Sequence, residues 1–487
     1  VSDGEYRVSK TGSAIFQTGA NGKARLLAIP AGSYTLAETN NPGFGKVEPV
    51  TFTVSNENTG DTPTVVGVEN QPLALEVFKV DKESQAPLAK VPFKLLNTEG
   101  EALHFTLGED GRYRTSKEGA DTFLTDAEGK ATILYVPQGV LSLVEQPYAG
   151  YGVAAPVSVT ISDENIVTLP KIVTVENEPL AVEIYKQDAY TKQPMAASFT
   201  LLDSAGKAVK LARMSDGTYR PADKAPATAT DSADAASLTT VETVDKLTLD
   251  GKTGKARIEY LPQGKYQLKE DAVSGYITLT GIEFELTSEH TKAQPLQFTV
   301  SNIPTRFLLE KQDGVTKQPL KGAKFKLTDE KGNVIKLVKQ EDGTYQPAKQ
   351  GETGVEVLEL SGDKAQAVIC YLPAGKVTVT EVEGPSGYSI AAPITTEVGT
   401  EVVLHTALAA QAEDMKKHTI AETSLAVIDL PLALKISKVH SKTQKPLAGA
   451  GFAIKAEGTL STPLRFTVRD GVYWYDPQGN VTTIQAA

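Results

Sequence analysis

The chain has 487 residues, of which 49 are basic and 60 acidic, so its formal net charge is −11. This acidic balance argues against nucleic acid as a main partner. The single cysteine, Cys370, excludes a disulfide within the chain, and no apolar run is long enough to span a membrane. Short alternating segments, separated by 40 glycines and 27 prolines, predict an all-β chain of sandwich modules.

Recurring landmarks predict five modules along the chain. We expect a partial module at 1–71, complete modules at 72–178, 179–303 and 304–430, and a second partial module at 431–487. The first lacks an opening strand that ends in lysine, and the last stops before a glutamate strand. The sequence therefore looks like a segment of a longer array. Its joints are short and contain proline, which predicts a semi-rigid rod.

Each complete module is expected to open with a strand that ends in a lysine. In residues 75–79, Lys79 has the same parity as Leu75 and Val77. Residues two apart on a strand point to the same face, so the lysine is predicted to face inward. The equivalent lysines are Lys186, Lys311 and Lys438.

A second strand, which follows a Pro-x-Gly turn, ends in a glutamate. Glu145 shares its parity with Leu141 and Leu143, and is therefore also expected to face inward. Its equivalents are Glu38, Glu270 and Glu381.

The last strand of each module ends in an amide or an acid on the same parity as its apolar residues. The members of this set are Asn70, Asn177, Asn302 and Asp429. The glutamate precedes the amide by 32 residues in the first three copies and the acid by 48 in the fourth, from 381 to 429. The extra length is a polar, Ala-rich insertion near 405–424, for which we expect a long loop, with a short helix as an option.

Charged side chains on the buried face of a sheet are costly unless they are paired or chemically consumed. A single lysine would be interpreted as a solvated strand end. Twelve residues of one parity argue against that interpretation, although the copies are related by repetition. A buried salt bridge with a hydrogen-bonding asparagine remains an open alternative.

Several motifs recur in order and carry a family resemblance over essentially the whole chain. They include Val77-Phe78-Lys79-Val80-Asp81, Phe93-Lys94-Leu95, Tyr135-Val136-Pro137-Gln138-Gly139, Leu143-Val144-Glu145, Gly150-Tyr151 and Val175-Glu176-Asn177-Glu178-Pro179. As a set they resemble tandem Cna-B-type (prealbumin-like, SpaA-type) domains of Gram-positive surface adhesins and pilins. The resemblance implies an elongated rod of Ig-like or prealbumin-like sandwiches on an extracellular, cell-wall-attached surface.

The resemblance also implies an isopeptide bond inside each complete module, formed once with a buried glutamate as proton shuttle. The implied sets are Lys79–Asn177 with Glu145, Lys186–Asn302 with Glu270, and Lys311–Asp429 with Glu381. In the partial modules, Glu38 and Asn70 would need a lysine upstream of Val1, and Lys438 would need partners beyond Ala487. Asp429 departs from the commoner asparagine. Bonded modules are expected to resist extension and proteolysis.

Three functions are compared on this basis. The first is a structural stalk, whose partners are the neighbouring modules of the same chain. The alternative is an adhesive module that binds a host protein or glycan through the loops near 405–424 and 222–245. A hydrolase is disfavoured, because the five histidines do not recur in register and no catalytic triad, phosphate loop or metal-ligand cluster is visible. No cofactor and no metal are expected. The histidines are His104, His290, His405, His418 and His440.

Overall fold

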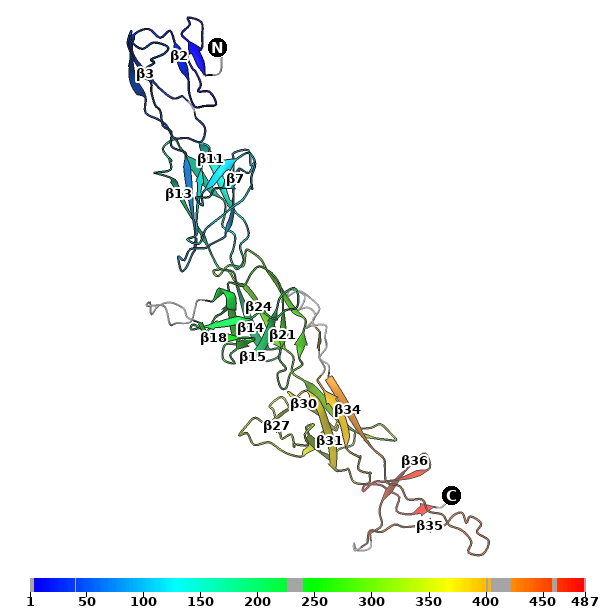
Figure 1. Ribbon diagram of the computed structural model, residues 1–487. Coiled ribbons are helices and arrows are strands. Elements are labelled where there is room, and N and C mark those ends of the chain that lie inside the picture. Colours follow the sequence, from blue (N-terminus) through cyan, green and yellow to red (C-terminus); the bar gives the residue numbers. More distant parts are fainter. Residues whose placement is uncertain are drawn as a thin grey trace.

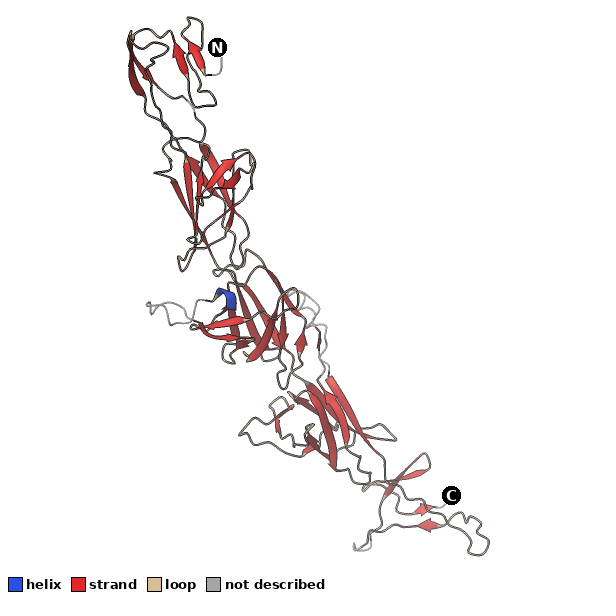
Figure 2. Cartoon of the chain, in the orientation of Figure 1, coloured by secondary structure: helices blue, strands red, loops and turns tan. Residues whose placement is uncertain are grey.

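The computed structural model describes residues 4–39, 41–225, 240–399, 402–403, 422–457 and 462–485. The chain forms a row of β-rich units that follow one another from the N-terminus to the C-terminus (Figure 1). Figure 2 shows that these units consist almost entirely of strands and loops. Among the described residues, the one helical element is the 3₁₀ turn η1, Ala222–Lys224. The expectation of an all-β chain of sandwich modules in a rod is confirmed.

Sandwich A occupies residues 74–177 and consists of two sheets. One has the strand order β13-β5-β10-β8-β7 and the other β12-β11-β6-β9. The strands of the first sheet are β13 (Lys171–Asn177), β5 (Ala74–Asp81), β10 (Lys130–Leu134), β8 (Tyr113–Ser116) and β7 (His104–Leu107). Those of the second are β12 (Val157–Ile161), β11 (Gly139–Glu145), β6 (Pro92–Leu96) and β9 (Phe123–Leu124).

Sandwich B occupies residues 181–302 and repeats this plan with one additional strand. Its larger sheet has the order β18-β16-β17-β20-β14-β24 and its smaller sheet β19-β15-β21-β23. The larger sheet comprises β18 (Thr240–Val244), β16 (Leu211–Met214), β17 (Tyr219–Pro221), β20 (Lys255–Glu259), β14 (Ala181–Asp188) and β24 (Leu296–Asn302). The smaller comprises β19 (Leu247–Leu249), β15 (Ala197–Leu202), β21 (Gly264–Glu270) and β23 (Ile282–Leu286).

Sandwich C occupies residues 306–429 and returns to the five-plus-four arrangement. The sheet orders are β27-β28-β30-β25-β34 and β29-β26-β31-β32. The first contains β27 (Leu337–Lys339), β28 (Tyr345–Pro347), β30 (Gln366–Cys370), β25 (Arg306–Asp313) and β34 (Glu422–Asp429). The second contains β29 (Leu358–Leu360), β26 (Ala323–Thr328), β31 (Gly375–Glu383) and β32 (Ile394–Val398).

The two ends of the chain form smaller sheets. At the N-terminal end, β1 (Glu5–Arg7) pairs with β2 (Arg25–Leu27), and β3 (Gly32–Leu36) with β4 (Val50–Val54). At the C-terminal end, β35 (Gly451–Phe452) pairs with β38 (Ile484–Gln485), and β36 (Phe466–Arg469) with β37 (Val472–Tyr475). A two-stranded sheet of β22 (Leu279–Thr280) and β33 (Val402–Val403) joins sandwich B to residues beyond β32.

The first and last strands of each sandwich are parallel neighbours, although about a hundred residues separate them along the chain. In sandwich A, Lys79 on β5 is paired with Val175 on β13. The same register joins Lys186 to Val300 and Lys311 to Val427. The side chain two residues further along the last strand therefore lies diagonally across from the lysine on the same face. That position holds Asn177, Asn302 or Asp429.

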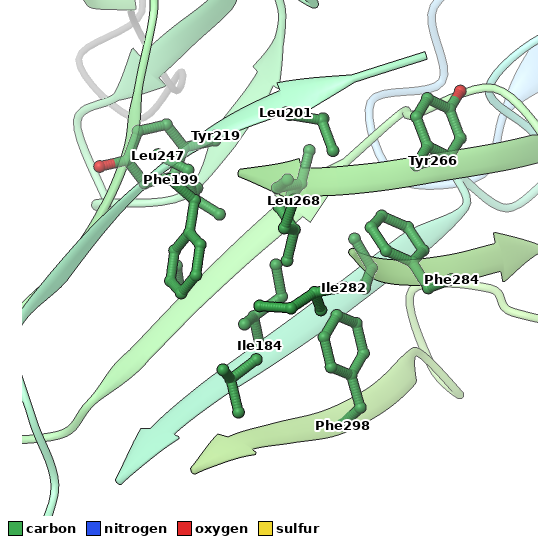
Figure 3. Close-up of a cluster of buried hydrophobic side chains, with 14 of the residues drawn as sticks. Ile184, Phe199, Leu201, Tyr219, Leu247, Tyr266, Leu268, Ile282, Phe284 and Phe298 are labelled. Atoms are coloured by element: carbon green, nitrogen blue, oxygen red, sulfur yellow. The ribbon is translucent and has the colours of Figure 1, made fainter. Parts of the chain in front are cut away.

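Each sandwich has its own apolar core, made by the inward-facing residues of both sheets. Figure 3 shows this for sandwich B, where Leu268 and Phe284 from the smaller sheet face Ile184 and Phe298 from the larger one. Strand β5 shows the underlying pattern: buried and half-buried residues alternate from Leu75 to Asp81. This alternation places the lysine among apolar side chains.

Part of the predicted 222–245 loop is regular structure. Thr240–Val244 forms β18, which pairs antiparallel with β16 and extends the larger sheet of sandwich B. The expectation of a loop is therefore wrong for these residues, because the chain returns to a free sheet edge and adds a strand there. Residues 226–239 and 404–421, which include most of the second insertion, lie outside the described residues.

Leu268→Ala should destabilise sandwich B by about 2–5 kcal/mol, because the side chain is fully buried and its removal leaves a cavity. The neighbouring exposed Lys269 on β21 provides the control, and Lys269→Ala should change the free energy by less than about 0.5 kcal/mol. Hydrogen exchange of peptides from 181–302 measures both. Equal exchange rates in the two variants would contradict the assigned core.

Candidate functional site

The lysine, glutamate and amide of sandwich A meet inside its core. Lys79 is on β5 and Asn177 on β13 of one sheet, whereas Glu145 extends from β11 of the other. Lys79 Nζ lies 3.2 Å from Glu145 Oε2, and Asn177 Nδ2 donates a hydrogen bond to Glu145 Oε1. The three side chains are almost completely shielded from solvent, with residue exposures of 0, 4 and 1 % for Lys79, Glu145 and Asn177.

Sandwich B brings the same three residue types together in a closed triangle. Lys186 Nζ lies 2.6 Å from Glu270 Oε1 and donates a hydrogen bond to Asn302 Oδ1. Asn302 Nδ2 donates to Glu270 Oε1 at 2.9 Å. The amine thus contacts the amide oxygen while the glutamate contacts both the amine and the amide nitrogen.

In sandwich C, two carboxyl groups surround one amine. Lys311 Nζ lies 2.9 Å from Glu381 Oε2 and forms an ion pair with Asp429 Oδ1. The side chains of all three residues are fully buried. Ala391 donates its backbone N–H to Glu381 Oε2 at 2.8 Å, as Ala154 does to Glu145 Oε2 at 3.2 Å in sandwich A.

Burial sets the electrostatics of these clusters. It lowers the pKa of Lys79 to about 8, although the neighbouring Glu145 carboxylate opposes the shift. Burial likewise lowers the pKa of Lys186 to about 8 against the opposing charge of Glu270. In sandwich C, burial raises the pKa of Glu381. A desolvated amine gives up its proton more readily, and a desolvated carboxyl group retains its proton. The shift favours the neutral amine in sandwiches A and B, and the neutral acid Glu381 in sandwich C.

A phenylalanine completes each cluster and was not identified from the sequence. Phe93, Phe199 and Phe325 lie opposite the glutamate on the adjacent strand. The Lys186 and Lys311 ammonium groups lie 5.5 and 5.9 Å from the ring centroids of Phe199 and Phe325. The repeated Phe-x-Leu motif was the available signal. These rings exclude water from the clusters and keep them apolar.

The counterparts in the partial modules are not buried. Asn70 Nδ2 donates to Glu38 Oε2 at 2.7 Å, yet Glu38 is exposed and Asn70 half-buried. Lys438 is exposed as well. The prediction that these three residues face a core is therefore wrong here, because no described strand covers them.

The other candidates from the sequence do not form a reactive site. Within the described ranges, no group of three or more His, Cys, Asp or Glu residues is placed to hold a metal ion. His405 and His418 lie outside the described residues. Burial raises the pKa of the half-buried Cys370 thiol, so it is a weaker nucleophile than an ordinary cysteine. No described helix is long and apolar enough to cross a membrane.

A second set of buried groups escaped the sequence analysis. Asp81, Asp188 and Asp313 lie two residues after the three lysines and are also buried. Their positions follow the same parity, and Lys-x-Asp recurs in all three sandwiches. Asp81 and Asp188 take part in contacts between sandwiches, which a strand pattern cannot reveal, whereas Asp313 accepts the hydroxyl of Tyr388 within sandwich C.

Comparison with known proteins places these clusters in a family. A family model described as SpaA, prealbumin-like fold domain, matches residues 74–177, 181–299 and 305–407. No curated protein matches the chain.

Solved structures with this similarity include the Bacillus anthracis TIE protein, at 19 % identity over 74 % of this chain and a TM-score of 0.30. The match covers 52 % of that protein, so the chain spans about half of its length. A streptococcal ancillary pilin matches at 17 % identity over 74 % of this chain and 99 % of the pilin, with a TM-score of 0.25. BcpA, the major pilin subunit of Bacillus cereus, matches at 13 % identity over 74 and 99 % of the two chains, with a TM-score of 0.24.

The family model covers most of the chain in three consecutive copies, each of which contains the lysine and the glutamate of one cluster. Asn177 ends the first matched range, whereas Asn302 and Asp429 lie beyond the second and third. The chain therefore belongs to the SpaA prealbumin-like fold family, as a tandem array of its domains.

Proposed function

We propose that this chain is a structural stalk segment of a Gram-positive surface adhesin or pilin-like protein. In this proposal, one isopeptide bond closes each of sandwiches A, B and C. The observation that carries it is the threefold occurrence of a buried lysine between a buried glutamate and a buried Asn or Asp. The proposed bonds are Lys79–Asn177, Lys186–Asn302 and Lys311–Asp429.

The chemistry follows from the contacts in each core. The neutral Nζ of Lys79 attacks Cγ of Asn177, and a proton passes from Nζ to Glu145 and then to Nδ2. The Nζ–Cγ bond forms, the Cγ–Nδ2 bond breaks, and ammonia leaves. Glu145 is suited to this transfer because its two oxygens contact the attacking amine and the departing nitrogen. Folding supplies the proximity of the reacting groups.

Sandwich C would follow the same course with water as the leaving group. A carboxylate resists attack, so Asp429 must first accept a proton. Burial raises the pKa of Glu381, which favours a proton on this pair of acids beside Lys311. In each sandwich the glutamate ends in the protonation state in which it began and no external substrate is consumed, so the event is a single maturation step.

The bonds would close loops of 98, 116 and 118 residues, measured from lysine to amide or acid. A cross-link that closes loops of this size restricts the unfolded chain and stabilises the fold by about 4–5 kcal/mol. Tension would pass from the first strand directly to the last strand. The intervening strands would carry little load, as a stalk requires.

Direct binding of a host protein or glycan stays a prediction. One of its two candidate loops contributes β18 to the framework of sandwich B. The stalk role is favoured because the three clusters recur in every complete sandwich, whereas β18 belongs to sandwich B alone among the described sheets.

Intact-mass measurement tests the bonds directly. The chain should be lighter than its sequence mass by two ammonia molecules and one water molecule. Lys79→Ala should restore one ammonia and lower the thermal stability of sandwich A. Lys82→Ala removes an exposed lysine of the same segment and should leave the deficit unchanged. A full sequence mass in the unmodified chain would contradict the proposal.

The pH dependence of bond formation tests the role of the glutamate. The reactive pair consists of a neutral Lys79 amine and a protonated Glu145. It has the same number of protons as the Lys79–Glu145 ion pair, so the fraction of reactive pairs does not change with pH while that proton is retained. The pKa of Lys79 near 8 marks the loss of that proton. The rate should therefore be nearly constant just below pH 8 and fall about tenfold per pH unit above it.

The rate can be followed by mass after unreacted chain is refolded from urea-solubilised inclusion bodies. Glu145→Gln, observed by circular dichroism under the same conditions, reports folding alone. A rate that rises up to about pH 8 and then levels off would show that the neutral amine suffices without a protonated glutamate.

A further inference from the structure

In sandwiches A and B, a buried aspartate ends the lysine strand and lies at the boundary with the following sandwich. Asp81 Oδ1 accepts the backbone N–H groups of Glu83 and Ser84, both at 2.9 Å, and so fixes the turn after β5. Asp188 Oδ1 does the same for Tyr190 and Thr191, at 2.7 and 2.8 Å. The second oxygen of each carboxylate is left for other donors.

In the joint between sandwiches A and B, two tyrosines from different sandwiches donate to that second oxygen. Tyr151 of sandwich A and Tyr260 of sandwich B donate their hydroxyls to Asp81 Oδ2 at 3.0 and 3.1 Å. Their rings meet edge to face, with centroids 5.5 Å apart and planes at 83°. Tyr260 is buried and packs into the apolar core of sandwich A.

The joint between sandwiches B and C repeats this arrangement. Asp188 Oδ2 accepts the hydroxyl of Tyr276 from sandwich B at 2.8 Å and that of Tyr371 from sandwich C at 2.9 Å. The two rings are 5.4 Å apart at 77°. Two joints with different neighbouring residues thus share one set of contacts. The joint that precedes sandwich A has an equivalent ring contact, since Phe44 meets Tyr135 edge to face at 5.3 Å.

The backbones of adjacent sandwiches also touch at these points. Tyr260 and Tyr371 both have φ near +60°, which brings their carbonyl groups up to a glycine of the preceding sandwich. A Cβ on Gly150 would lie 2.7 Å from the Tyr260 carbonyl oxygen, and one on Gly275 would lie 2.9 Å from that of Tyr371. Only glycine allows this approach, and both glycines have a positive φ.

The charge on the aspartate explains why the tyrosine hydroxyls donate the hydrogen bonds and the carboxylate accepts them. A buried carboxylate needs several donors to offset its lost hydration. Burial and the nearby Asp81 charge raise the pKa of Tyr151 and of Tyr260, so both hydroxyls keep their protons and act as donors. Docking of the next sandwich therefore supplies a donor that the carboxylate would otherwise have to find in water.

Additional charges hold the A–B joint. Lys292 of sandwich B extends to Glu83 of sandwich A at 2.7 Å and to Glu259 at 3.1 Å. The Arg220 guanidinium lies 4.2 Å from the centroid of the Tyr260 ring. Arg220 therefore covers the tyrosine from the side of sandwich B.

We propose that Asp81 and Asp188 are docking sites for the tyrosine hydroxyl of the following sandwich, and that each docked tyrosine holds its joint in one orientation. The stiffness of the rod then resides in these two clusters. A three-residue linker, 178–180 or 303–305, by itself leaves adjacent domains free to move. The inference goes beyond the proposed isopeptide bonds and does not depend on their formation.

Distances between spin labels in adjacent sandwiches test the proposal. Labels on Thr160→Cys and Lys269→Cys, in a Cys370→Ser background of the full chain, report on the A–B joint from exposed positions. The parent should give one narrow distance distribution. Tyr260→Phe keeps the ring but removes the hydroxyl, and the width of the distribution should at least double. Asp81→Asn should have the same effect.

Tyr219→Phe is the matched control, because Tyr219 is a buried tyrosine of sandwich B whose hydroxyl donates to Thr248 within that sandwich. Its distribution should remain narrow. Hydrogen exchange in the cores of A and B, unchanged in Tyr260→Phe, would show that both sandwiches remain folded. An unaltered distribution in Tyr260→Phe, or equal broadening in Tyr219→Phe, would overturn the proposal. The mass deficit is measured on the same samples, so failure of the cross-links is detected separately.

Discussion

The structure depends on how a lysine amine is accommodated in an apolar core. An ammonium group removed from water is unstable unless a carboxylate lies beside it or it loses its charge. Each complete sandwich places a glutamate from the opposite sheet against the amine. The amide or acid of the last strand contacts the amine in sandwiches B and C and the glutamate in sandwich A. A simple ion pair would satisfy the charge. The third residue, which contacts the amine in sandwiches B and C, is what the proposed covalent closure adds to a simple ion pair.

Parallel pairing of the first and last strands determines how the proposed bond would transmit force along the chain. The register places Lys79 diagonally opposite Asn177, immediately before the chain enters the next sandwich. Asp81, two residues beyond the lysine, then contacts the tyrosine of that next sandwich. The proposed cross-link and the joint are therefore consecutive along one strand. With the proposed bonds in place, load would travel through the first strand, the side-chain bond and the joint, so the stiffness of the rod would depend on the joint contacts.

The sequence predicted the all-β architecture. It also predicted that the nine residues of the three clusters face inward, because strand parity and repetition are signals that can be read directly along the chain. It did not reveal the aspartate–tyrosine contacts, since Tyr260 and Asp81 are 179 residues apart and belong to different sandwiches. It also misplaced Glu38 and Lys438, which have the correct parity but no described strand to cover them. Thr240–Val244 was assigned to a loop because its polar composition hides a strand that pairs with a sheet edge.

A high-resolution crystal structure tests the central claim most directly. The account predicts continuous electron density from Lys79 Nζ to Asn177 Cγ, with no separate peak for Asn177 Nδ2, and Glu145 hydrogen-bonded to the resulting amide. Equivalent density should join Lys186 to Asn302 and Lys311 to Asp429. The account would be contradicted if all three lysines ended in ammonium groups without a covalent bond. Each would then form an ion pair with its glutamate beside an intact amide or acid.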